Sequence, residues 1–156
     1  MIDGTIGKFT LKQQAGFSGV ALKLGQPSGP GVTLGFDLIN TAADELLTSG
    51  PGTASVNGIN LINISTANDP YLTLGNYALI SIPAGGLTGT FDFANGLTTE
   101  SVTVGGNSYT LELTNTDTAE TLTVLPEPAG FAVLAVGGAL VVHRRTRRSR
   151  FPSGRG

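Results

Sequence analysis

Short runs in which apolar and polar residues alternate, separated by glycine-rich turns, constrain this 156-residue chain more than any other feature. Apolar side chains stand at every second position in residues 32–38, 109–113 and 122–124. A period of two places one side of a strand against a core and leaves the other side polar. Exposed helices are usually coated with Glu and Lys, but only 13% of the residues here are charged. The pattern predicts a single all-β body.

Turn residues and further apolar runs place the remaining elements of this body. Further strands are predicted at residues 8–12, 17–24, 55–64, 71–82 and 91–93. The pairs Asn57-Gly58 and Gly105-Gly106 are typical of hairpins and favour antiparallel pairing of the strands on either side. Residues 42–47 (AADELL) predict one short helix.

Charge is divided unevenly between the body and the C-terminal tail. Residues 1–127 hold three Lys and all eleven acidic residues, a net charge of −8, whereas residues 128–156 hold six Arg and no acid. An acidic body lacks the basic face that binds a phosphate backbone, so nucleic acid is excluded as its partner. The chain has no Cys, which excludes disulfides, thiolate metal sites and Cys nucleophiles.

The tail combines an apolar run with a basic end. Residues 129–142 carry no charge, and as a helix they would span about 21 Å at roughly 1.5 Å per residue. Arg stems lie along the apolar zone while their heads reach the interface, so a helix extended to Arg148 matches the ~30 Å hydrocarbon core. Positive residues beside a span stay in the cytoplasm. We therefore predict a transmembrane helix at residues 129–143, a cytoplasmic tail and an extracytoplasmic body.

The order of elements at this end resembles a known sorting signal. A Pro-Glu-Pro motif follows Leu125 and precedes the apolar run, and a cluster of arginines comes after it. This order resembles the PEP-CTERM signal, which implies processing by exosortase, an integral-membrane cysteine transpeptidase-like enzyme of bacteria that make extracellular polysaccharide. The sorting motif consists of Pro126, Glu127 and Pro128. The membrane-flanking basic cluster consists of Arg144, Arg145, Arg147 and Arg148.

Two departures from that family concern the ends of the chain. A short polar segment (SRFPSGRG) follows Arg148, and the N-terminal residues lack the apolar core of a signal peptide. Because the strand pattern begins by about Ile6 without a cap, we expect the chain to be the end of a longer secreted protein.

The body is similar to the C-terminal end of autotransporter-passenger-like β-helix repeats, over residues 31–124. The similarity rests on an Asp-x-Leu step at residues 44–46, a Gly-x-Tyr-x-Leu-Ile strand at residues 75–80 and a Gly-Leu-Thr-Gly-Thr-Phe turn at residues 86–91. It implies a β-solenoid, in which stacked strands bury their faces against their neighbours. The hairpin signals favour the alternative, an antiparallel β-sandwich.

Catalytic and metal-binding chemistry finds little support in the sequence. The one histidine, His143, lies beside the arginine cluster, which excludes a Ser-His-Asp triad and a His-based zinc site in the body. The candidates for paired acid–base catalysis are predicted to be ordinary charges at solvent-facing or loop positions: Asp92, Glu100, Glu112 and Glu120. The pairs Asp44-Glu45 and Asn68-Asp69 are candidate Ca²⁺ ligands, but no spaced series of Asp residues supports a Ca²⁺ site. The candidate sugar-stacking residues, Tyr71, Tyr77 and Tyr109, are predicted to be half-buried residues of the sheets. We predict no catalytic residue, no metal and no cofactor.

These observations predict a non-enzymatic bacterial cell-surface or exopolysaccharide-matrix protein. Its parts are a β-rich extracytoplasmic body (residues 1–124), the sorting motif (125–128), the transmembrane helix (129–143) and the basic tail (144–156). The expected partners are exosortase and the membrane, with exopolysaccharide as a further candidate. The expected location is the bacterial envelope, first as an inner-membrane anchored precursor and then, after processing, at the surface or outside the cell. The alternative is a carbohydrate-binding surface module on the same tail.

Overall fold

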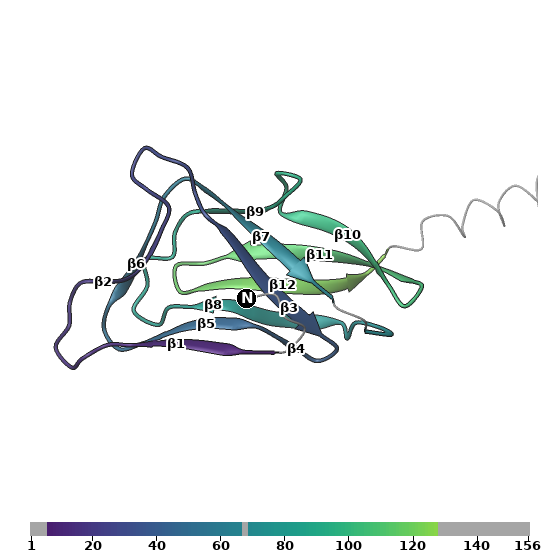
Figure 1. Cartoon of the computed structure of the whole chain (residues 1–156), viewed down its shortest axis with the longest axis horizontal. Coiled ribbons are helices and arrows are strands. Elements are labelled where there is room, and N and C mark those ends of the chain that lie inside the picture. Colours follow the sequence, from purple (N-terminus) through teal and green to yellow (C-terminus); the bar gives the residue numbers. More distant parts are fainter. Residues whose placement is uncertain (1–5, 67–68, 128–156) are drawn as a thin grey trace, which may run out of the picture.

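The computed structural model describes residues 6–66 and 69–127, and over these residues the protein is all β, as the alternation predicts (Figure 1). The strand predicted at residues 8–12 is confirmed without a shift, whereas residues 55–64 divide between two strands. The strands are β1 (Lys8–Lys12), β2 (Val20–Leu24), β3 (Thr33–Ile39), β4 (Ala42–Ala43), β5 (Glu45–Ser49), β6 (Thr53–Val56), β7 (Ile59–Ser65), β8 (Gly75–Ser81), β9 (Thr90–Phe93), β10 (Thr99–Val104), β11 (Asn107–Asn115) and β12 (Ala119–Pro126).

Residues 42–47 form β4 and the first part of β5, so the helix predicted there was wrong. β5 lies between β1 and β8 and pairs in parallel with both. Between β4 and β5, the carboxylate of Asp44 accepts hydrogen bonds from the backbone N–H groups of Gly7 (2.6 Å) and Asp37 (2.9 Å). Pairing with strands distant in the sequence overrides the local helix preference of this segment.

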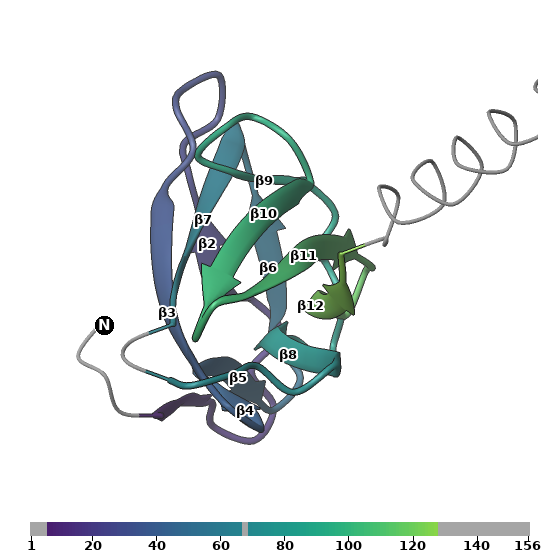
Figure 2. The same cartoon turned by 90° about the vertical axis from the view of Figure 1, so that its right-hand side faces the viewer.

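Strands from successive parts of the chain stack in parallel. One sheet contains the parallel neighbours β1, β5 and β8, a second contains β2 and β6, and a third contains β3, β7 and β9. We call β1, β2 and β3 the first rung, β5, β6 and β7 the second rung, and β8 and β9 the third rung. Figure 2 shows β3 and β7 on one side of the body and β8, β11 and β12 on the other.

The strand register places inward side chains of the rungs in columns. Leu34 pairs with Ile62, and Ile62 pairs with Phe93, so each rung supplies one apolar side chain at the same level. Leu46 pairs with Ile80 in the same way. Ile62, Ile80 and Phe93 are fully buried, and burying a side chain of this size contributes roughly 1.5–3 kcal/mol. These columns form the core between the sheets.

The Asn57-Gly58 pair forms a corner between β6 and β7, and the hairpin predicted there was wrong. β6 pairs with β2, whereas β7 pairs with β3 and β9, so the strands on either side of the turn do not pair with each other. Consecutive rungs touch backbone to backbone at this corner. A Cβ atom on Gly31 would overlap the carbonyl of Ile59, and one on Gly58 would crowd the backbone nitrogen of Gly31. Glycine is required on both rungs because it has no Cβ.

The buried side chain of Asn60 ties the three rungs together at the same corner. Its Oδ1 accepts a hydrogen bond from the backbone N–H of Val32 (3.1 Å), just before β3. Its Nδ2 donates to the carbonyl of Thr90 (3.3 Å), at the start of β9, and to the carbonyls of Asn57 and Gly58 (3.4 Å each). One side chain of the second rung therefore satisfies backbone groups of the first and third rungs.

An antiparallel unit follows the third rung. β10 and β11 form the hairpin that Gly105-Gly106 predicts, and β12 pairs with β11 on one side and β8 on the other. A register shift between Glu120 and Thr121 interrupts the β12–β8 ladder. β12 ends at Pro126, so the sheet includes the first residue of the Pro-Glu-Pro motif.

The opposite edge of this sheet is open. Among the described residues, β1 pairs with β5 alone. Phe9 pairs with the core-packed Leu46, yet it is 65% exposed because no described strand covers it. A hollow of about 560 Å³ lies between β1 and β3, and its lining includes Phe9, Leu34, Phe36 and Leu46. The core is therefore accessible at the first rung.

Candidate functional site

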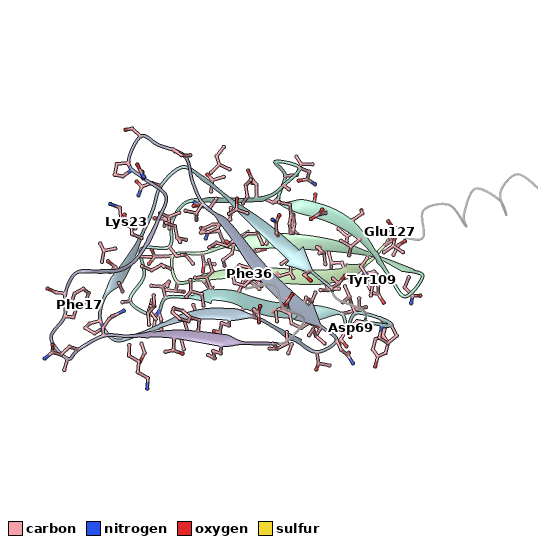
Figure 3. The ribbon with its side chains drawn as sticks, viewed as in Figure 1. Phe17, Lys23, Phe36, Asp69, Tyr109 and Glu127 are labelled. Atoms are coloured by element: carbon pink, nitrogen blue, oxygen red, sulfur yellow. The ribbon has the colours of Figure 1, made fainter. Side chains whose placement is uncertain are left out.

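The C-terminal strand leads directly into the Pro-Glu-Pro motif, the predicted sorting signal. Pro126 pairs with Tyr109 of β11, and the backbone N–H of Glu127 donates to the carbonyl of Ser108 (3.4 Å). Leu125, Pro126 and Glu127 are all exposed. The motif therefore begins as an extended, accessible strand end, and Figure 3 shows Glu127 at the end of the body opposite Phe17.

Among the described residues, only β11 pairs with this strand end. The ladder between β8 and β12 ends at the pair of Gly75 and Val124, so β11 alone holds Leu125 and Pro126. Proline lacks an N–H group and is tolerated at such an edge, where no second ladder needs that donor. No described strand covers the other side of Leu125 and Pro126.

The remaining predicted elements of the tail lie outside the described residues. These are Pro128, the apolar run 129–142 and the basic cluster Arg144, Arg145, Arg147 and Arg148. Within residues 6–66 and 69–127, no helix is long and apolar enough to cross a membrane.

Glu120 is completely buried, which corrects the prediction that it faces solvent. Its Oε2 accepts a hydrogen bond from the Asn115 side chain (2.9 Å), and Asn115 also donates to the carbonyl of Leu87 (3.1 Å). The other oxygen, Oε1, has no hydrogen-bond partner among the described residues. Burial raises the pKa of Glu120 to about 7, although the Asn115 hydrogen bond opposes the increase. Its parity with Leu122 and Val124 was the sequence signal for burial, because alternate residues of a strand share a face.

The other candidate carboxylates are exposed, partly exposed or bonded to other side chains of the protein. Glu112 is exposed, and Asp92 and Glu100 are partly exposed. Glu45 forms an ion pair with Lys8 (2.6 Å) and accepts a hydrogen bond from Ser81 (2.8 Å). Burial opposes ionisation of Glu45, but these two contacts lower its pKa overall.

The candidate Ca²⁺ ligands also have structural roles. Both oxygens of Asp44 accept backbone hydrogen bonds, as described above, and Asp69 accepts one from the backbone N–H of Asn40 (2.7 Å). Asn68 lies outside the described residues. In the part of the chain that the structure describes, no three His, Cys, Asp or Glu residues gather as a metal site.

The three tyrosines do not form a common exposed platform. Tyr77 and Tyr109 are buried, at 9% and 8% exposure, whereas Tyr71 is 49% exposed. The Tyr77 hydroxyl donates to the carbonyl of Thr73 (2.7 Å), and the Tyr109 hydroxyl accepts from the backbone N–H of Leu72 (3.2 Å). Two of the three rings therefore pack in the body, and their hydroxyls hold the backbone at Leu72 and Thr73 in place.

No family model matches the chain, and no curated protein or solved structure is significantly similar to it. The strongest functional candidate is consequently the C-terminal site itself, where Pro126 and Glu127 are accessible and an apolar run with a basic end follows in the sequence.

Proposed function

We propose that this protein is a non-enzymatic component of the bacterial cell surface or of an exopolysaccharide matrix. Its C-terminal signal directs an extracytoplasmic β body to exosortase, which processes the chain near the Pro-Glu-Pro motif. The observation that carries the proposal is the order of elements after β12: Pro126, Glu127, Pro128, an uncharged run and a cluster of arginines. The exposure of Pro126 and Glu127 at an extended strand end supports it, because a processing enzyme must reach this backbone.

The charge distribution supports the orientation within the membrane. The tail beyond the apolar run carries arginines and no acid, whereas the body is acidic. Positive residues beside a span remain in the cytoplasm, so the body faces outward in the precursor. The proposed location is the envelope, with release to the surface or the extracellular space after processing.

For the body, we propose a β-solenoid end closed by antiparallel strands. Parallel pairing between the first and second rungs and between the second and third supports this. The aligned side chains Leu34, Ile62 and Phe93, and the bridging role of Asn60, support it further. Such a body supplies a stable spacer whose stability arises from contacts between neighbouring rungs.

Processing near the motif is the direct test of the proposed function. In a host with exosortase, and with a secretion signal added at the N-terminus, the mature protein is expected to lack the segment beyond the Pro-Glu-Pro region. The double substitution Glu127→Ala and Pro128→Ala is expected to leave an uncleaved form, because it removes the charge and the rigid backbone of the motif. Intact mass spectrometry of the purified protein measures both outcomes.

The exposed residue Glu112 of β11 provides a matched control. The Glu112→Ala protein is expected to be processed like the unaltered protein, because this change leaves the motif intact. If the unaltered protein keeps the mass of the full chain in the exosortase-containing host, the sorting proposal is wrong.

A glycan array separates the scaffold from a carbohydrate-binding module. A scaffold is expected to show no saturable binding to any arrayed glycan, because only one of the three tyrosines is exposed and no stacking platform is formed by them. Saturable binding that is lost in the Tyr71→Ala protein would replace the scaffold proposal with a lectin function.

A further inference from the structure

The distance between the folded body and the predicted membrane span is very short. Among the described residues, the last one with a hydrogen bond to the body is Glu127, whose N–H donates to the carbonyl of Ser108. Only Pro128 separates it from the apolar run that begins at Ala129. One residue extends the chain by at most about 3.5 Å. While Glu127 remains on β11, the body cannot lie further than a few ångströms from the start of that run.

Several contacts define which part of the body surrounds this exit point. Gly105 packs against the carbonyl of Pro70, and the backbone N–H of Leu72 bonds to the hydroxyl of Tyr109, the residue paired with Pro126. Segment 70–74 and the 105–106 turn therefore lie at the same end of the body as the exit of β12.

This end exposes apolar side chains. Leu74 is 51% exposed, Tyr71 is 49% exposed and Leu125 is 38% exposed. Leu74 directly precedes Gly75, and Leu125 directly follows Val124, the residues that form the last pair of the β8–β12 ladder. The two leucines therefore lie just beyond the last pair of this ladder, on the side of the exit point. We call Tyr71, Leu74 and Leu125 the exit-end patch.

We propose that, in the unprocessed protein, the exit-end patch rests in the interfacial region of the lipid bilayer. This inference depends on the membrane span of the proposed function. The headgroup region on each side of a bilayer is roughly 5–7 Å thick, and a connection of one residue keeps the exit point, at the same end of the body as the patch, close to the start of the predicted span. Leu and Tyr are suited to this region because they bury apolar area while the Tyr hydroxyl remains hydrated. The acidic residues at this end, Asp69 and Glu127, favour a zwitterionic surface over an anionic one.

Single fluorescent probes can test this placement, because the chain has no Cys. The full chain would carry one cysteine in place of Tyr71, Leu74, Phe17 or Ala135, each labelled with an environment-sensitive fluorophore. Phe17 is an exposed residue at the far end of the body (Figure 3), and Ala135 lies within the apolar run. Each protein would be reconstituted into phosphatidylcholine vesicles, with and without lipids that carry a nitroxide quencher in the headgroup region.

The expected result is a blue-shifted and quenched probe at positions 71 and 74, a quenched probe at position 135, and an unquenched probe with aqueous emission at position 17. Two patch positions are used so that a folding defect at one of them, detected by circular dichroism, leaves the other informative. If position 135 reports lipid while positions 71 and 74 report water, the inference is wrong and the proposed span stands. If position 135 also reports water, the span itself is wrong, and the inference is overturned with it.

Discussion

Replacing Asn60 by Ala is expected to lower the free energy of unfolding by about 3–4 kcal/mol. The change leaves the partly buried N–H of Val32 and the carbonyl of Thr90 without their side-chain partner, and an unsatisfied polar group in the protein interior costs about 1–3 kcal/mol. It also creates a small cavity where three rungs meet. Chemical unfolding of the full chain in a mild non-ionic detergent, followed by circular dichroism, measures the loss.

Two further substitutions show whether the hydrogen bonds of Asn60 are responsible. Asn60→Asp keeps the volume and the acceptor for Val32 but places a second oxygen against the carbonyls of Asn57, Gly58 and Thr90. This protein is expected to be at least as unstable as the Ala variant. Asn63 lies on the same strand and is exposed, so Asn63→Ala is the matched control and is expected to change stability by less than about 0.5 kcal/mol. Equal effects of the changes at positions 60 and 63 would contradict the bridging role.

Replacing Glu120 by Gln is expected to remove a pH-dependent loss of stability of about 3 kcal/mol. The pKa of Glu120 is about 7 in the folded protein, against an ordinary value of 4.5, and each pKa unit corresponds to about 1.4 kcal/mol. The folded protein thus binds a proton more tightly than the unfolded chain. The contribution of Glu120 to stability is fully present below about pH 4.5, is lost as the pH rises from about 4.5 to about 7, and changes no further above that range.

Unfolding measured at intervals from pH 4 to pH 8.5 tests the sign and the size of this effect. The Glu120→Gln protein is expected to lack this decline and to be the more stable protein at pH 8, because the amide cannot ionise within the core. Glu112 on the neighbouring strand is exposed, and Glu112→Gln is expected to leave the pH profile of the unaltered protein in place. A parallel profile for the Glu120→Gln and unaltered proteins would show that Glu120 is not the group concerned.

The elements predicted correctly from the sequence are those that depend on neighbouring residues. The alternation in β3, β11 and β12 identifies strands because adjacent side chains of a strand point to opposite faces. Gly105-Gly106 identifies the β10–β11 hairpin because both glycines adopt a positive φ, of 56° and 81°, in a tight turn. The sorting signal stays a prediction from local sequence, and the pairing of Pro126 with Tyr109 is visible only in the structure.

Other features depended on partners that are far away in the chain. Asn57-Gly58 has the composition of a hairpin turn, but it forms a corner because Ile62 pairs with Leu34 and Phe93 in other rungs. Residues 42–47 have a helical composition, but β5 is held between two parallel neighbours. Local sequence cannot specify such pairing, since the stabilising contacts come from residues about 30 positions apart in the first case.

The contrast is clearest at Glu120. The local sequence determined that its side chain lies on the same face of β12 as Leu122 and Val124, because the three residues stand at alternate positions of the strand. Residue type alone suggested a solvent-facing charge, since Glu is seldom fully buried. Only the tertiary structure placed β8 on one side of β12 and β11 on the other, with the Asn115 amide against one carboxylate oxygen. Burial in a sheet with neighbours on both sides is a property of the assembled strands, and it turns an ordinary carboxyl group into one that titrates near neutral pH.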